Sequence, residues 1–107
     1  MSGAEILTEA YDLVTGPRGD VYSHPADDYR KVVTLFRTMT GIDMTASHGV
    51  MFMICVKMAR IATNMQRGDW HHDGVVDAAG YLACLSMIHE RNQELLAHLK
   101  EHSHDEY

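Results

Sequence analysis

Two positively charged and two negatively charged side chains are the residues of this sequence best suited to chemistry. Lys57 and Arg60 lie three positions apart in an almost wholly apolar stretch, so they share one stripe of a predicted helix. Asp73 and Asp77 lie four positions apart at the start of the next predicted helix and also share a face. Charges rarely sit among so much apolar surface unless they are paired or bind something charged, so we expect these four to meet between helices.

This cluster has two interpretations. In the first, Lys57 and Arg60 bind phosphate groups while Asp73 and Asp77 hold Mg²⁺, which needs only one or two protein carboxylates beside phosphate and water. In the second, the four charges form an interhelical salt-bridge network that fixes the register of the helices. The residue types and their spacing leave both interpretations open.

Five further polar or aromatic residues are candidate ligand or partner contacts. His24 and Asp27 begin a predicted helix, where they either bind a ligand or transfer a proton, or cap the helix and anchor the preceding loop. Tyr22 and Tyr81 either offer a hydroxyl or stacking face to a ligand, or are core residues whose hydroxyl finds an internal partner. Trp70, in a predicted loop, is a candidate contact for a partner protein.

Helical periodicity positions these residues, and strong β-alternation is absent. Pro25 suits the first position of a helix, Gly41 suits the end of that helix, and Thr45 suits the N-cap of the next. Helices joined by short loops favour a small all-α, four-helix up-and-down bundle. The predicted helices cover about residues 4–14, 25–40, 46–66 and 73–99.

Length and composition limit the class of protein. A chain of 107 residues with 46% hydrophobic residues predicts one domain over 1–107, with a core at about 4–99 and a flexible tail at 100–107. A net charge of −6 argues against nucleic-acid binding, which needs many cations. No secretion signal or membrane-spanning run is visible, so we expect a cytoplasmic protein that binds no membrane. Cys55 and Cys84 are expected to be ordinary buried thiols, with a disulfide left open.

The third predicted helix carries information about assembly. It is apolar nearly all round, with residues 51–56 forming an uninterrupted apolar run. Such a helix lies either at the centre of a bundle or in an oligomer interface. Because a small four-helix monomer cannot cover so many apolar positions, we expect a homo-oligomer, most simply a two-fold dimer.

Three ordered motifs resemble a family of small, mostly phage-encoded domains of unknown function. They are His-Pro-x-Asp at 24–27, Lys-x-x-Arg at 57–60 and Asp-x-x-x-Asp-x-Ala-Gly-Tyr at 73–81. The resemblance covers roughly residues 20 to 90. It implies a phage origin and a bacterial host cytoplasm, but the family carries no assigned activity.

More distantly, the order of helices and the element from Asp77 to Tyr81 are similar to the MazG-like all-α nucleoside triphosphate pyrophosphohydrolases. That resemblance implies binding of a nucleotide or other phosphorylated metabolite and hydrolysis by water activated on Mg²⁺. The sequence departs from the MazG-like pattern, because the helix expected to carry Glu-Glu-x-x-Glu has no carboxylate between Val56 and Ile61. The alternative is a non-enzymatic module that sequesters a nucleotide signal or engages a host protein, so whether the chain is an enzyme stays open.

Overall fold

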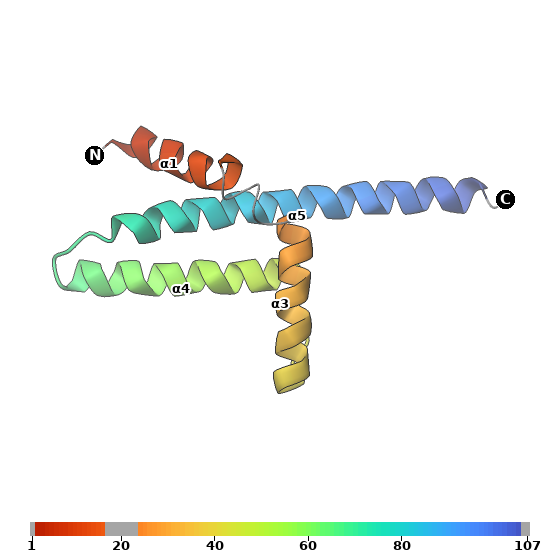
Figure 1. The fold of residues 1–107 in the computed structure, drawn as a ribbon, viewed down its shortest axis with the longest axis horizontal. Helices are drawn as coiled ribbons and strands as arrows, with labels where there is room; N and C mark the ends of the chain where they lie inside the picture. Colours follow the sequence, from red (N-terminus) through yellow and green to blue (C-terminus); the bar gives the residue numbers. More distant parts are fainter. Residues whose placement is uncertain (1, 17–23, 106–107) are drawn as a thin grey trace.

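The computed structural model describes residues 2–16 and 24–105. Tyr22 lies outside the described residues. Within them the chain is all-helical, without strands, as predicted. The helices are α1 (Gly3–Thr15), α3 (Pro25–Thr40), α4 (Ala46–Gln66) and α5 (His72–Asp105) (Figure 1).

Local sequence signals explain where the helices begin and end. Thr45 caps α4, since its side chain accepts a hydrogen bond from the backbone N–H of His48. Pro25 occupies the first turn of α3. Gly41 ends α3 with φ of 76°, in the left-handed region that glycine adopts without strain. The predicted limits of the first three helices are therefore confirmed to within a residue.

The helices do not form the expected up-and-down bundle. α4 and α5 pair as an antiparallel hairpin, α1 lies along the first half of α5, and α3 runs across the hairpin (Figure 1). A close approach accompanies this crossing, because a Cβ on Gly49 of α4 would lie 3.2 Å from side-chain atoms of both Tyr29 and Val33 of α3. The small residue at the start of α4 lets α3 cross over it.

The folded chain is long and open for its size. Its radius of gyration is 17.1 Å, against about 13 Å for a compact domain of this length. Its accessible surface is 7993 Å², against about 6,000 Å² for a compact monomer of 12.1 kDa. The enclosed hydrophobic side chains are few: Ala10, Val33, Val50, Ile61, Val76, Ala78 and Ile88.

α5 contributes much of this length. Residues 100–105, which the sequence predicted to be part of a flexible tail, continue α5 as helix. The second half of α5 extends beyond the other helices (Figure 1). None of the helices among residues 2–16 and 24–105 is long and apolar enough to cross a membrane.

The expectation of two buried thiols is wrong for Cys55. Both cysteines are free, but Cys55 is exposed and Cys84 is half-buried. Cys55 lies on the side of α4 that points away from α5, whereas Val50 and Ile61 lie on the side that packs on α5 and are buried. An apolar neighbourhood in sequence does not bury a residue that points away from the partner helix.

Candidate functional site

One ion pair joins the two predicted charge groups. Lys57 of α4 places its Nζ 3.0 Å from Oδ2 of Asp77 on α5. The Lys57 side chain is only 14% exposed and that of Asp77 is 33% exposed. The pair therefore lies at the packed side of the hairpin, where each charge offsets the cost of desolvating the other.

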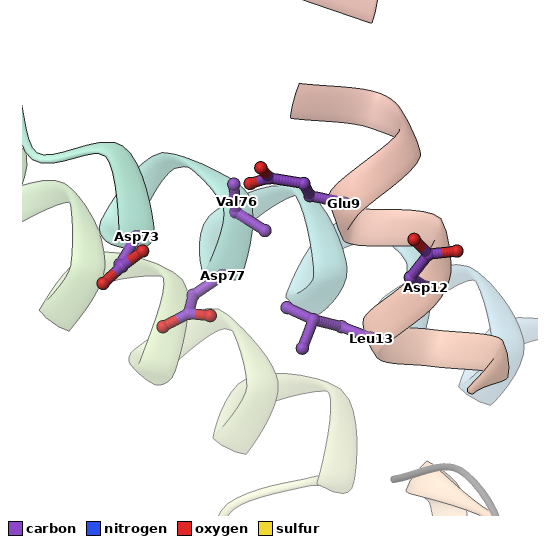
Figure 2. A pocket seen from close by; sticks show the side chains of 6 residues that line it. All are labelled: Glu9, Asp12, Leu13, Asp73, Val76 and Asp77. Atoms are coloured by element: carbon purple, nitrogen blue, oxygen red, sulfur yellow. The ribbon is translucent and has the colours of Figure 1, made fainter. Parts of the chain in front are cut away.

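Asp73 does not join this ion pair but lies close to it. Asp73 and Asp77 are one turn apart on α5 and line a depression of about 490 Å³ that α1 closes on the other side. Figure 2 shows Glu9 of α1 reaching toward α5, while both aspartate carboxylates lie on the side of α5 next to α4. Asp12 adds a fourth carboxylate to the lining. The depression is thus strongly acidic.

The acidic depression carries one contact that sequence reasoning missed. Nε2 of His72, the first residue of α5, hydrogen-bonds Oε2 of Glu9. This contact fastens α1 to the beginning of α5. The two residues are 63 positions apart, and no periodicity in either helix indicates that they meet.

Arg60 lies in a different place. It is exposed and lines a separate depression of about 350 Å³, formed by the last turns of α4 and by His71. Among the described residues, none forms an ion pair with Arg60. The other polar residues of this lining, Thr63, Asn64 and His71, are uncharged or weakly basic. A planar guanidinium without a carboxylate beside it is well suited to bind an anion.

Two hydrogen bonds and one close contact hold the Arg60 depression in shape. The side-chain amide of Asn64 donates to the carbonyl oxygen of Arg60 at 2.8 Å, and the Thr63 hydroxyl donates to the carbonyl oxygen of Ala59 at 3.0 Å. The ring of His71 lies over Gly74, where a Cβ would come within 2.1 Å of His71 Nδ1. His71 Nδ1 is enclosed and has no hydrogen-bond partner among the described groups.

His24 and Asp27 have structural contacts in this fold. Nδ1 of His24 accepts a hydrogen bond from the backbone N–H of Ala26, so His24 is the N-cap of α3. The Asp27 carboxylate lies 3.6 Å from Arg30 on the same helix and 3.6 Å from Arg91 on α5. These contacts cap α3 and connect it to α5.

Tyr81 meets another tyrosine between α3 and α5. Burial, the neighbouring Tyr81 and a hydrogen bond between the two hydroxyls raise the pKa of Tyr29 well above its ordinary value of 10.0. Burial also raises the pKa of the Cys84 thiol. Tyr81 therefore lies beside Tyr29 at the α3 crossing.

The predicted site residues thus fall into separate groups. The structure brings Lys57, Asp77 and Asp73 together, and it places Arg60 in the second depression. His24, Asp27 and Tyr81 lie around the α3 crossing. No set of three or more His, Cys, Asp or Glu side chains among residues 2–16 and 24–105 is arranged to hold a metal ion.

Comparison with known proteins gives a family and two phage relatives. The pattern of a family described as a domain of unknown function (DUF6378) matches residues 5–89. The Gene 55 protein of Mycobacterium phage D29 is 30% identical over 89 residues, which are 83% of this chain and 56% of that protein. The Gene 55 protein of Mycobacterium phage L5 is 32% identical over 84 residues, 78% of this chain and 51% of that protein. The chain spans about half the length of these relatives. No solved structure matches.

Proposed function

This chain belongs to the DUF6378 family of domains of unknown function, and from that premise we propose that it is a non-enzymatic, self-associating module that binds a phosphate-bearing small molecule, such as a nucleotide, at Arg60. The observation that carries the proposal is the free guanidinium: Arg60 is exposed, lines a depression without carboxylates, and has no ion-pair partner among the described residues. Arginine binds phosphate oxygens through paired N–H donors.

Lys57 has another role in this proposal. It lies 3.0 Å from Asp77 and is largely enclosed, so its charge is already engaged within the chain. A phosphate that took Lys57 would leave the Asp77 carboxylate without its partner. Lys57 therefore braces the hairpin beside the binding residue Arg60, and it does not share the ligand.

The MazG-like interpretation requires Mg²⁺ at Asp73 and Asp77, and the residues fit that ion poorly. The two carboxylates line one depression, but Lys57 already neutralises Asp77. Mg²⁺ bound there would need phosphate oxygens and water for its remaining positions, whereas Arg60 lies in the other depression. We therefore propose binding without hydrolysis and derive no step through a metal.

A titration with matched probes tests this proposal. We expect ATP and pyrophosphate to bind the protein in isothermal titration, and adenosine, which has no phosphate, not to bind. Arg60→Gln should weaken binding by about tenfold or more. Arg37→Gln removes the same charge from an exposed position on α3 and should leave the affinity unchanged.

Two results would reject the proposal. One is that neither phosphate probe binds at millimolar concentration. The other is that the Arg60 variant binds as well as the unmodified protein. Release of phosphate or pyrophosphate from ATP with Mg²⁺, lost in Asp73→Asn, would restore the enzymatic interpretation.

Binding to a host protein is the second candidate function, and exposure of Trp70 favours it. Trp70 is 59% exposed in the connection between α4 and α5. It is also the only tryptophan of the chain, so its fluorescence reports directly on contacts at this end. Two results together would support this function. One is a blue shift of Trp70 fluorescence on adding a purified host protein. The other is that a pull-down with the Trp70→Ala variant no longer recovers that host protein.

A further inference from the structure

One side of α4, next to the side that packs on α5, exposes a continuous apolar surface. Its central row is Met51, Cys55, Met58, Ala62 and Met65, and all five are exposed. Their alternating intervals of four and three residues place them on one stripe over four turns. We call this stripe the Met face.

The Met face carries no charged side chain. Each of its three methionines is more than half exposed, and Phe52 beside the row is 62% exposed. Val50 and Ile61 each precede a residue of this row, so they lie about 100° round the helix from it, and both are buried. α4 is thus apolar nearly all round, a pattern found in helices that are enclosed on all sides, and the chain itself encloses only one side.

We propose that the Met face is the interface of a two-fold dimer, in which α4 of one copy packs antiparallel on α4 of a second copy. A two-fold interface needs a surface that complements itself. The Met face meets this requirement about Met58, which would face Met58 of the second copy. Cys55 would face Ala62 of the second copy, so that small residues meet between pairs of methionines.

The excess surface of the chain is large enough for this interface. The accessible surface is 7993 Å², about 2,000 Å² above that of a compact monomer of this mass. A stable interface takes about 800 Å² from each partner. A dimer through α4 therefore removes a substantial part of the excess, and it leaves surface on α3 and on the end of α5 outside the contact.

Charge also favours a second copy on this face. Each chain carries a net charge of −6, so two copies repel unless their contact excludes carboxylates. The Met face contributes no carboxylate. Acidic residues of α1 and α5 lie instead around the depression of Glu9, Asp12, Asp73 and Asp77.

Particle mass tests the proposal directly. Light scattering after size exclusion, without any ligand, should give about twice the 12.1 kDa chain mass. Met58→Glu places two carboxylates together at the two-fold axis and should weaken association by about 100-fold or more. Leu99→Glu makes the same change at an exposed position of α5 and should remain a dimer.

Disulfide trapping keeps the test decisive if the Met58→Glu chain fails to fold. In a Cys55→Ser, Cys84→Ser background, Met58→Cys should form an intermolecular disulfide on mild oxidation, and Leu99→Cys should not. A monomer at tens of micromolar would overturn the proposal. So would a dimer that is cross-linked through Leu99→Cys and not through Met58→Cys.

The interface specifies the self-association included in the proposed function and does not depend on the ligand. Arg60→Gln should leave the particle mass unchanged. Conversely, Met58→Glu should still bind phosphate, because Arg60 stays exposed in that variant. Loss of phosphate binding with an intact dimer rejects the proposed ligand alone, whereas a monomer that binds phosphate rejects the interface alone.

Discussion

The two sides of α4 reverse the usual distribution of residues. The side toward α5 contains the Lys57 side chain, which is only 14% exposed and whose ammonium nitrogen lies 3.0 Å from Asp77. The neighbouring side, about 100° round the helix, exposes Met51, Met58 and Met65, which carry no charge. Charge is enclosed on one side of the helix, and apolar surface is open on the other.

The comparison teaches which interactions the chain completes by itself. The enclosed Lys57 has its charge partner, Asp77, within the fold. The apolar side has no covering element among the described residues, because α1 and α3 both lie elsewhere on the hairpin (Figure 1). One side of α4 therefore packs within the chain, and the other is the side on which we propose that a second copy binds.

The largest expected effect comes from breaking the enclosed pair. Lys57→Met leaves the Asp77 carboxylate without its partner and should lower the free energy of unfolding by about 3 kcal/mol, the lower end of the range for buried pairs because Asp77 is partly exposed. Urea denaturation measures this. Adding Asp77→Leu should restore most of the loss. Unchanged stability with lost phosphate binding would instead make Lys57 a ligand contact.

Two glycines near the beginning of α5, Gly74 and Gly80, offer a second test of the packing within the chain. Gly74→Ala places a methyl group 2.1 Å from His71 Nδ1, so the ring must move, at a cost of about 1–2 kcal/mol. In Gly80→Ala the new methyl meets only Val14 at 4.0 Å, and the substitution should stabilise the helix by about 0.5–1 kcal/mol. Thermal unfolding of both variants should show opposite shifts, and equal shifts would contradict the close packing of His71.

The exposed Met face leads us to predict that stability depends on protein concentration. If a second copy covers the Met face, each tenfold increase in concentration adds about 1.4 kcal/mol per dimer and raises the melting temperature by roughly 3 °C. Calorimetry over a hundredfold concentration range measures this shift. In Met58→Glu the dependence should vanish. A melting temperature independent of concentration in the unmodified protein would mean that no second copy covers the Met face.

Alkaline pH probes the polar groups enclosed at the α3 crossing. The pKa of Tyr29 is raised in the folded state, so above pH 10 the unfolded chain loses this proton while the folded chain keeps it. Stability should therefore fall as pH rises above 10, by up to about 1.4 kcal/mol per unit. Tyr29→Phe should flatten the slope, and Tyr11→Phe, at an exposed tyrosine, should not. Equal slopes in both variants would place the titrating group elsewhere.

The smallest effect should come from an ion pair on the outer surface. Arg37 lies 3.5 Å from Asp43, and both side chains are largely exposed. Arg37→Ala should change the free energy of unfolding by less than about 0.5 kcal/mol, because water already screens this pair. Urea denaturation beside Lys57→Met measures the contrast. A loss as large as that of Lys57→Met would remove the distinction between enclosed and exposed charge.

Much of the fold could be predicted from the sequence, because its determinants are local. The cap at Thr45, the proline at position 25 and the left-handed Gly41 set helix limits that the structure confirms. The crossing of α3 was not predictable in this way. It depends on a close approach at Gly49, and helical periodicity reports which residues share a face but not the angle at which faces meet.

The candidate site could be predicted only in part, because sequence patterns show which residues share a helix face but not where the helices meet. The meeting of Lys57 and Asp77 follows from two apolar helices that each carry one charge on the packed side. The separation of Arg60 from that pair depends on where α5 begins relative to the last turns of α4. The contact between Glu9 and His72 depends on the placement of α1, which no pattern within either helix encodes.

The length of α5 has a mechanical consequence. Thirty-four residues make a rod of about 50 Å, and its second half projects from the body of the molecule (Figure 1). A helical segment without neighbours is only marginally stable in water and opens most readily at the end farthest from the packed helices. Backbone amides near this end should therefore exchange hydrogen for deuterium far sooner than those beside α4. The molecule therefore combines a packed base with a projecting helical segment that opens more easily.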